Sequence, residues 1–389
     1  MRPPPIRTDG SNAFARFSMQ ERVPRIARDV LAHNPDYPAD IVRAVEGLAS
    51  AIEANAPLPP ARPPGPAVPA WTAADSEHAG ESWLGTEWFF AELAFYRELV
   101  RACRFWETGR DPFAPVKDEE LSGRRPWSRL EAALDAAASD RVDAVASLLE
   151  ACLWGNRVDL SYTIAAERTE RQDDDLLVDE RASAARLLAK PGARVHFVAD
   201  NAGTELALDL ALVDALLGDA STRVTLHVKI EPVFVSDAMP SDVWRLLERM
   251  HAGRADVSSI AARIESSFAE GRLELAPDPF WSGPSFLWRA PAHLRRSFAS
   301  ATVVVIKGDA NYRRLVGDAM WPTTTTLPRA CGYMPVPLVC VRTLKSDPVL
   351  GLRAGLAERL DVAHPSWRVD GRHGVVQTYV PDDDGVADG

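Results

Sequence analysis

The residues best suited to chemistry follow an apolar segment in the middle of this 389-residue chain. The segment 195–199 (VHFVA) leads at once to Asp200 and Asn201, and a helical stretch begins near residue 204. In a parallel sheet, ligands bind at this kind of junction between strand and helix. A carboxylate beside an amide supplies hard oxygen ligands that suit Mg²⁺ or Mn²⁺. The same pair could instead cap the helix, with Gly203 easing a tight turn.

Three later apolar segments end in the same way. The segments 224–230, 302–306 and 337–341 lead to Glu231–Asp237, Lys307–Arg314 and Arg342–Lys345. Because the carboxyl ends of parallel strands meet at one edge of a sheet, we expect these side chains to converge. Ordinary loops are polar too, but they seldom combine carboxylates with cations at equivalent strand ends. The convergence therefore favours a ligand site over a set of unrelated loops.

The chemistry that fits these residue types is the cleavage of a phosphate ester. Asp200, Asn201 and Asp237 would hold one divalent metal, which would polarise the phosphoryl group and lower the pKa of a bound water. These three residues are the predicted catalytic and metal-binding set. Three cations would bind the charge of the transferring phosphoryl group: Arg313, Arg342 and Lys345.

Two acids and one lysine among these residues have competing interpretations. Glu205 lies one helical turn after Asn201, so it could bind substrate hydroxyls or orient the attacking water, or it could only complement the helix dipole. Asp237 could be an exposed loop acid or a cap for the helix expected at 241. Lys307 is interpreted as a solvated lysine at a strand end and is given no role.

The arrangement of apolar residues predicts an α/β protein. Helical periodicity at 20–55, 83–106 and 128–152 makes the first 190 residues mostly helical, with an extended Pro-rich connector at 56–70. Strand-like segments then alternate with helical stretches at 204–218, 241–252 and 256–270, and a fifth segment lies at 375–380. This order predicts an α/β/α sandwich with a mixed or parallel sheet. We expect a helical N-terminal domain at 1–190 and a metal- and substrate-binding domain at 191–389.

Composition excludes several classes of function. The formal net charge of -11 argues against a nucleic-acid partner, because phosphate backbones need a basic surface. The four cysteines show no zinc spacing and are interpreted as free thiols in a reducing compartment. We see no signal peptide and no apolar stretch long enough to span a membrane, so we expect a cytoplasmic protein without a membrane partner. No dinucleotide fingerprint, P-loop, GxSxG elbow or HExxH motif is present, and His196 and His227 are interpreted as core residues.

The strand-end motifs resemble those of the metal-dependent damage-control phosphatase family, in the RTxK-motif subgroup that includes acidic residue methyltransferase-like proteins. Four segments carry the resemblance: DNAGTE at 200–205 with Asp209, VSD at 235–237, KGDANYR at 307–313 and RTLK at 342–345. Three more segments are similar to family motifs: WFFAE at 88–92, DPF at 111–113 and WGNRVDLS at 154–161. The resemblance covers most of residues 20–355, and the joint order of the motifs is specific. The Pro-rich insert at 56–70 is the clearest departure.

The resemblance implies a helical domain packed on an α/β/α domain. It implies metal ligation by Asp200, Asn201 and Asp237. The implied substrate contacts are Asp200, Asn201, Glu205, Asp309, Asn311, Arg313 and Lys345, to which the argument from charge adds Arg342. The implied activity is Mn²⁺-, Co²⁺- or Ni²⁺-dependent hydrolysis of small phosphometabolites such as fructose 1-phosphate and fructose 6-phosphate. Mg²⁺ is also compatible with such oxygen ligands.

The sequence thus predicts a cytoplasmic metal-dependent phosphatase that hydrolyses a sugar phosphate, or a related damaged phosphometabolite, by metal-activated water. A variant of this chemistry makes Asp200 a covalent nucleophile. Two other hypotheses are an S-adenosylmethionine-dependent protein carboxyl methyltransferase and a non-catalytic phosphometabolite-binding protein. The expected partner is a small phosphorylated metabolite, and the sequence leaves the oligomeric state open.

Overall fold

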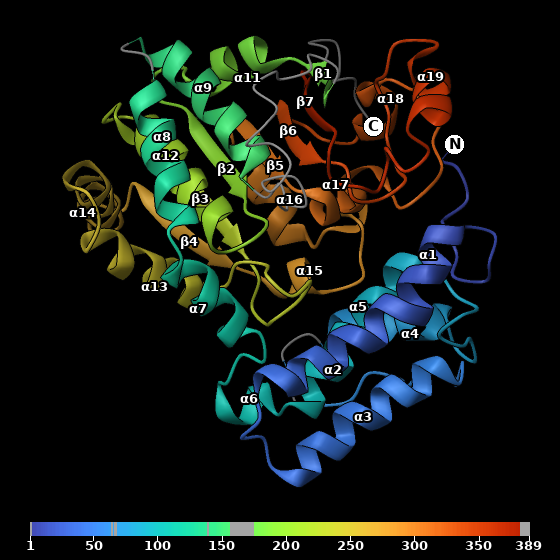
Figure 1. The fold of residues 1–389 in the computed structure, drawn as a ribbon. Helices are drawn as coiled ribbons and strands as arrows, with labels where there is room; N and C mark the ends of the chain where they lie inside the picture. The colour runs from blue at the N-terminus through green and yellow to red at the C-terminus, as the bar shows by residue number, and fades with distance from the viewer. Residues whose placement is uncertain (1, 64, 66–67, 138–139, 156–174, 382–389) are drawn as a thin grey trace.

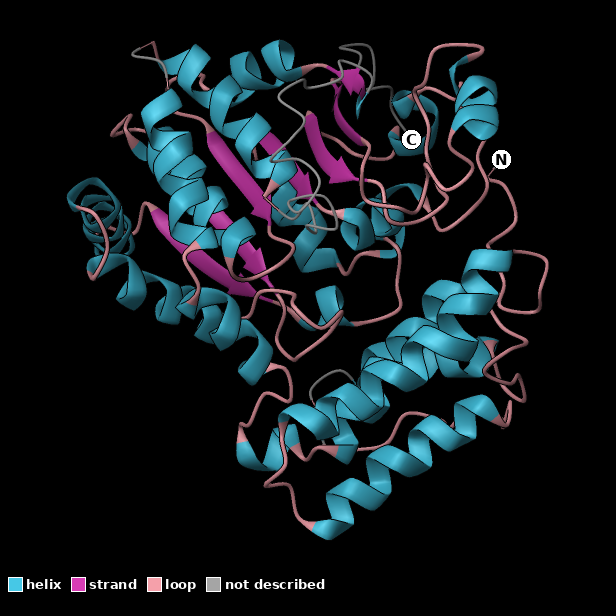
Figure 2. Ribbon diagram, viewed as in Figure 1, coloured by secondary structure: helices cyan, strands magenta, loops and turns pink. Residues whose placement is uncertain are grey.

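A sheet of seven strands forms the centre of the computed structural model, which describes residues 2–63, 65, 68–137, 140–155 and 175–381. From edge to edge the strands are β1 (Leu176–Asp179), β7 (Gly374–Tyr379), β6 (Leu338–Thr343), β5 (Val303–Lys307), β2 (Arg194–Val198), β3 (Arg223–Val228) and β4 (Leu273–Pro277). β6 and β7 pair antiparallel, whereas all other neighbours are parallel. Figure 2 shows the strands in magenta between layers of helices. The predicted α/β fold with a mixed or parallel sheet is confirmed.

The central strands are apolar because helices cover both of their faces. Every residue of β5 is buried, and its sequence VVVIK has the β-branched side chains that pack well on a pleated surface. His196 on β2 and His227 on β3 lie in this interior, with Nδ1 of the first 2.8 Å from Nε2 of the second. Their interpretation as core histidines is confirmed.

Two layers of helices enclose the sheet (Figure 1). One face packs into a single hydrophobic cluster with α8 (Arg125–Ala136), α9 (Arg141–Trp154), α11 (Arg181–Leu188), α12 (Thr204–Leu217), α13 (Pro240–His251) and α14 (Ala255–Ala269). The other face is covered by α15 (Pro279–Ser282), η3 (Leu287–Arg289), α16 (Ala292–Ala299), α17 (Asp309–Val316) and α18 (Leu327–Cys331). A smaller cluster lies under α19 (Leu356–Ala363) beside β7.

A helical lobe, blue to cyan in Figure 1, precedes this sandwich and has its own hydrophobic core. Its helices are α1 (Ala13–Phe17), η1 (Ser18–Arg22), α2 (Val23–His33), α3 (Ala39–Glu53), α4 (Val68–Glu77), α5 (Trp88–Ala102) and α6 (Phe105–Thr108). α5 is buried along almost its whole length, so it is the central helix of the lobe. α7 (Ala114–Ser122) leads from the lobe to the sandwich.

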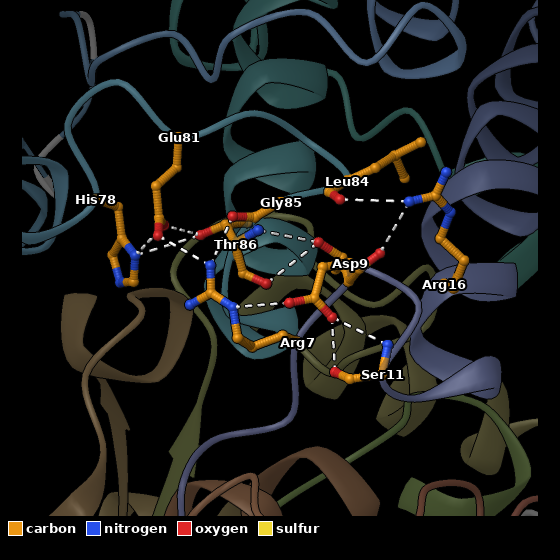
Figure 3. A network of polar contacts seen from close by, with 10 residues as sticks. Arg7, Asp9, Ser11, Arg16, His78, Glu81, Leu84, Gly85 and Thr86 are labelled. Atoms are coloured by element: carbon orange, nitrogen blue, oxygen red, sulfur yellow. Dashed lines mark hydrogen bonds and ion pairs between the residues drawn. The ribbon is translucent and has the colours of Figure 1, made fainter.

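Hydrogen bonds from the first residues of the chain connect segments of the lobe (Figure 3). Arg7 donates to Oε1 of Glu81 at 3.1 Å and to the carbonyl of Gly85 at 2.6 Å. The hydroxyl of Thr86 donates to the other oxygen of Glu81 at 2.5 Å, and the ring of His78 contacts the same oxygen at 2.7 Å. Main-chain bonds from Ile6 to Asp318 and from Trp88 to Ile6 continue the connection towards α17.

The structure adds two strands to the predicted fold and shortens the predicted connector. The strands β1 and β4 were not predicted: β1 has only four residues, and β4 is an edge strand whose residues are mostly half-buried or exposed, which weakens the apolar signal. The predicted connector at 56–70 ends earlier, because α4 begins at Val68; proline is tolerated in the first helical turn. The domain limits 1–190 and 191–389 stay a prediction, although α8, α9 and α11 share a hydrophobic core with the sheet.

Candidate active site

The predicted site lies where the chain leaves β2 and β5 in opposite directions. β2 and β5 are parallel neighbours. The helix after β2, α12, packs on one face of the sheet, and the helix after β5, α17, packs on the other. Such a switch point opens a crevice at the carboxyl ends of the two strands, which is the usual ligand site of an open α/β sheet. Asp200 and Asn201 follow β2 at this crevice, and Gly308 follows β5.

The loop after β3 brings Asp237 to the same place. Asn201 and Asp237 form an isolated antiparallel bridge, and the amide of Ala238 donates to the carbonyl of Asp200 at 2.8 Å. The hydroxyl of Ser236 donates to Oδ1 of Asn201 at 2.5 Å. Only 1 % of Asp237 is exposed, so it is not the exposed loop acid of the competing interpretation. The structure therefore brings Asp200, Asn201 and Asp237 together, whereas their role as metal ligands stays a prediction.

Glycine is required where Asp200 approaches β5. Gly308 has φ +82°, and a Cβ built on it would lie 2.0 Å from Cγ of Asp200. Burial raises the pKa of Asp200 well above its usual value, and the charges of Glu205 and Asp237 add to the rise. Burial also raises the pKa of Asp237, to about 6. Buried carboxylates that repel one another are the arrangement that a bound cation stabilises.

Glu205 and Lys307 form a buried pair behind Asn201. Nδ2 of Asn201 donates to Oε2 of Glu205 at 3.0 Å, and Nζ of Lys307 donates to Oε1 at 2.7 Å. Lys307 also lies 3.4 Å from Oδ1 of Asp209 and donates to the carbonyl of Cys152 at 2.9 Å. The interpretation of Lys307 as a solvated lysine was therefore wrong: it is 1 % exposed, because β5 is a central strand and its end is covered by α9 and α12.

Asp309 organises the turn that carries Lys345. Its Oδ1 accepts from Nε of Arg342 at 2.8 Å and from the amide of Lys345 at 3.0 Å. Arg342 also donates to the carbonyl of Ser346 at 2.9 Å and to that of Pro348. Burial alone would raise the pKa of Asp309, but the guanidinium groups of Arg342 and Arg313 hold it below its usual value. Since Arg342 is 1 % exposed and engaged in this turn, the structure does not favour the predicted direct contact with substrate.

Lys345 is the predicted cation whose side chain is free to bind a ligand. It is half-buried, and its ammonium has no ion-pair partner in the part of the chain that the structure describes. Its charge nevertheless acts on Asp200, where it opposes the rise in pKa caused by burial. The charge of Lys345 therefore acts on the acidic end of the site, and its direct contact with substrate stays a prediction.

The side chains of Asn311 and Arg313 bond to other residues of the protein. Nδ2 of Asn311 donates to the carbonyls of Ala199 and Lys307, at 2.9 and 2.8 Å, and so ties β2 to β5. Arg313 points instead towards the helical lobe, where its guanidinium lies 3.9 Å from a ring centroid of Trp88. It donates to Glu92 at 2.7 Å and to Asp318 at 2.8 Å. The predicted substrate contact of Arg313 is thus not what the geometry favours; its guanidinium is already paired.

Three residues at the site were missed by the sequence analysis. Lys229 follows β3 and lies 3.3 Å from Oδ2 of Asp237; it escaped notice because the expected strand ran through to residue 230. Lys117, on α7, donates to the carbonyl of Asp237 at 3.2 Å, and no local signal in the sequence marks it. Glu120 accepts from the amide of Thr204 at 3.0 Å and so caps α12 in place of the predicted Asp or Asn cap.

The comparison with known families decides the assignment. Residues 18–360 match the family model described as the damage-control phosphatase ARMT1-like domain. The chain belongs to this family. Relatives named damage-control phosphatase ARMT1 include one from Rattus norvegicus, 31% identical over 76% of this chain and 74% of that protein. Another, from Homo sapiens, is 31% identical over 78% of this chain and 76% of that protein.

A solved structure supports the fold of this ARMT1-like chain. It is a DUF89 family protein from Pyrococcus horikoshii, with a TM-score of 0.51 over 94% of this chain and 98% of the other. The sequence identity is 14%, so the likeness concerns the fold. The predicted motif at 154–161 lies outside the described residues from 156 onward.

Two features are absent from the part of the chain that the structure describes. No helix there is long and apolar enough to cross a membrane. Within the same residues, no three His, Cys, Asp or Glu side chains are grouped as a metal site would need. The set predicted for this ARMT1-like site has two acids and one amide, and therefore does not depend on such a group.

Proposed function

We propose that this chain is a metal-dependent phosphomonoester hydrolase. Its substrates would be small sugar phosphates or related damaged phosphometabolites, of the fructose 1-phosphate and fructose 6-phosphate type. The observation that supports this proposal most strongly is the meeting of Asp200, Asn201 and Asp237 at the switch point of the sheet. The charge of Lys345 also acts on Asp200 there. Membership in the damage-control phosphatase family supports the same reaction.

The residues present fit a divalent cation. Oδ2 of Asp237 is buried and accepts no hydrogen bond from the described residues, although Nζ of Lys229 lies 3.3 Å from it, and Asp200 is buried as well. Asp200, Asn201 and Asp237 would hold the ion with oxygen atoms alone, which suits Mn²⁺, Co²⁺, Ni²⁺ or Mg²⁺. When bound, the ion supplies Lewis-acid polarisation of a phosphoryl oxygen and acidifies a water molecule.

The protein groups around these ligands would bind and orient the substrate. Lys345 would bind the phosphoryl oxygens, because its side chain has no ion-pair partner among the described residues and its backbone is fixed by Asp309. Glu205 would orient Asn201, since its carboxylate bonds to the amide of that residue and to Lys307. Arg342 and Arg313 would act by holding Asp309 and α17 in place.

The attacking group is proposed to be water. Asp200 already accepts a hydrogen bond from Nδ2 of Asn201 at 2.7 Å and lies against Gly308, which favours a fixed ligand over an attacking nucleophile. A phospho-enzyme trapped on Asp200 would contradict this assignment. We also propose a cytoplasmic location, consistent with four free, buried cysteines.

A phosphate-release screen tests the proposal. Protein stripped with EDTA is reloaded with Mn²⁺, Co²⁺, Ni²⁺ or Mg²⁺ and given a panel of sugar phosphates. Asp237→Ala should lose both the metal and the activity, whereas Lys345→Ala should keep the metal and lose kcat/KM. Asp29→Ala and Lys190→Ala, at exposed positions, serve as controls. Full activity with retained metal in Asp237→Ala would refute the metal assignment.

A further inference from the structure

We propose that Lys229 is a positioning residue for this site, and that its ammonium sets the orientation in which the Asp237 carboxylate meets the metal. The inference rests on the proposed function and deepens it. No motif in the sequence analysis includes Lys229. Three features support it: the strained loop that carries Asp237, the contacts of Lys229, and the link from Lys229 to the opposite strand.

The loop that delivers Asp237 has a strained backbone. Phe234 and Val235 have φ of +51° and +69°, in the left-handed region that non-glycine residues seldom adopt. For the β-branched Val235 such a conformation is unfavourable, because its Cβ approaches the following carbonyl oxygen. Strain of this kind persists only where the surrounding structure determines the backbone. The position of Asp237 therefore depends on contacts outside its own loop.

Lys229 makes such contacts from the end of β3. Its Nζ lies 3.3 Å from Oδ2 of Asp237 and donates to Oδ1 of Asn311 at 3.0 Å. Its backbone amide donates to the carbonyl of Ala238 at 2.9 Å, so both its main chain and its side chain hold the loop. Among the described residues, Lys229 is the cation within ion-pair distance of the Asp237 carboxylate.

The other basic contact of the loop acts on the main chain. Lys117 donates to the carbonyl of Asp237 at 3.2 Å and is held by Asp242 at 2.8 Å and Asp111 at 3.0 Å. It therefore fixes where the residue sits, but not which way the carboxylate points. We therefore infer that Lys229 orients the carboxylate of Asp237.

Asn311 connects Lys229 to the other half of the site. Its amide nitrogen donates to the carbonyls that follow β2 and end β5, those of Ala199 and Lys307. Lys229 thus joins the loop after β3 to the two strands whose ends carry Asp200 and Gly308. Only 1 % of Lys229 is exposed, so solvent does not weaken these contacts. Groups that orient metal ligands in this way commonly change affinity or activity 10–100-fold when removed.

The test compares Lys229→Met with Lys229→Gln. Methionine is unbranched and only one heavy atom shorter than lysine, and it removes the charge, whereas glutamine keeps a hydrogen-bond donor. Protein loaded with Co²⁺ is titrated by calorimetry, and its visible absorption spectrum reports ligand geometry independently of turnover. Thermal unfolding of the metal-free proteins and the separate values of kcat and KM complete the measurements. Lys190→Met, at an exposed position, is the control.

We expect Lys229→Met to bind Co²⁺ 10–100-fold more weakly, with an altered spectrum and a kcat that falls more than KM changes. Lys229→Gln should show a smaller loss, and it carries the test if the methionine variant does not fold. A lower melting temperature with the spectrum and affinity of the wild type would show that Lys229 is merely structural and would overturn the inference. Failure of the wild-type protein itself to bind Co²⁺, Mn²⁺ or Ni²⁺ would instead overturn the proposed function, and this inference with it.

Discussion

The carboxylate of Asp200 lies against the main chain of Gly308, so that the acid after β2 touches the glycine after β5. A Cβ on Gly308 would lie 2.0 Å from Cγ of Asp200, and the φ of +82° disfavours any other residue. Gly308→Ala should therefore displace Asp200 and reduce kcat/KM about 100-fold, as misplacement of a reacting group by about 1 Å does. Phosphate-release kinetics and calorimetric titration with Mn²⁺ measure the effect.

A glycine in open space supplies the control for this change. Gly47 lies in α3, and a Cβ added there would have no atom of the described residues within 4 Å. Gly47→Ala should therefore leave activity unchanged and stabilise the helix by up to about 1 kcal/mol. Wild-type kinetics in Gly308→Ala would show that the contact with Asp200 has no functional importance.

Arg313 should matter for stability more than for substrate binding. It is 3 % exposed and paired with Glu92 and Asp318, so Arg313→Met leaves two buried acids without their partner. Breaking a buried pair in this way costs about 3–5 kcal/mol. Urea unfolding should show this loss, while the KM of the folded fraction stays near that of the wild type. A tenfold rise in KM with unchanged stability would show instead that Arg313 contacts the substrate, as the sequence predicted.

Glu231 should make the protein less stable as the pH rises. It is 5 % exposed, accepts from Nε1 of Trp106 at 2.9 Å, and burial raises its pKa from 4.5 to about 7. The folded state therefore holds this proton more tightly than the unfolded state. The stabilisation is complete below pH 4.5 and is lost as the pH rises through about 7.

Glu231→Gln removes this titration and keeps an acceptor for Trp106. The variant should gain stability relative to the wild type as the pH rises from 5 to 8. Since each unit of pKa shift corresponds to about 1.4 kcal/mol, the difference in the free energy of unfolding should change by about 3 kcal/mol or less. Chemical unfolding at both pH values measures it. Glu274→Gln, at an exposed position on β4, is the matched control. A constant difference for Glu231→Gln would mean that Glu231 titrates as in water.

The sequence could predict which strand ends meet, but not what covers them. Asp200, Asp237 and Lys345 follow apolar segments, and the topology of a parallel sheet brings such ends together whatever their separation in the chain. The partners of Lys307 and Arg313 depend on which helices pack above them. That is decided by contacts over 102 and 221 residues of separation, which no local pattern records.

The backbone conformation of the loop before Asp237 could not be predicted from the sequence either. Val235 has φ +69°, although β-branched residues avoid this region, and its side chain packs partly against the core of the helical lobe. Val235→Gly should relieve about 1–2 kcal/mol of strain. It should lose a similar amount through the greater freedom of the unfolded chain and the missing side chain, so stability should change by less than about 1 kcal/mol.

The loop of this variant can adopt other conformations, however, and we expect its affinity for Mn²⁺ to fall several-fold at nearly constant stability. Val235→Ala is the matched control, because it loses packing but keeps a Cβ and therefore the preference against positive φ. It should be less stable than the wild type, with nearly unchanged affinity for the metal. Calorimetric titration and urea unfolding of both variants separate the two effects. Equal metal affinities in the glycine variant, the alanine variant and the wild type would show that the strained backbone at Val235 does not hold Asp237 in place.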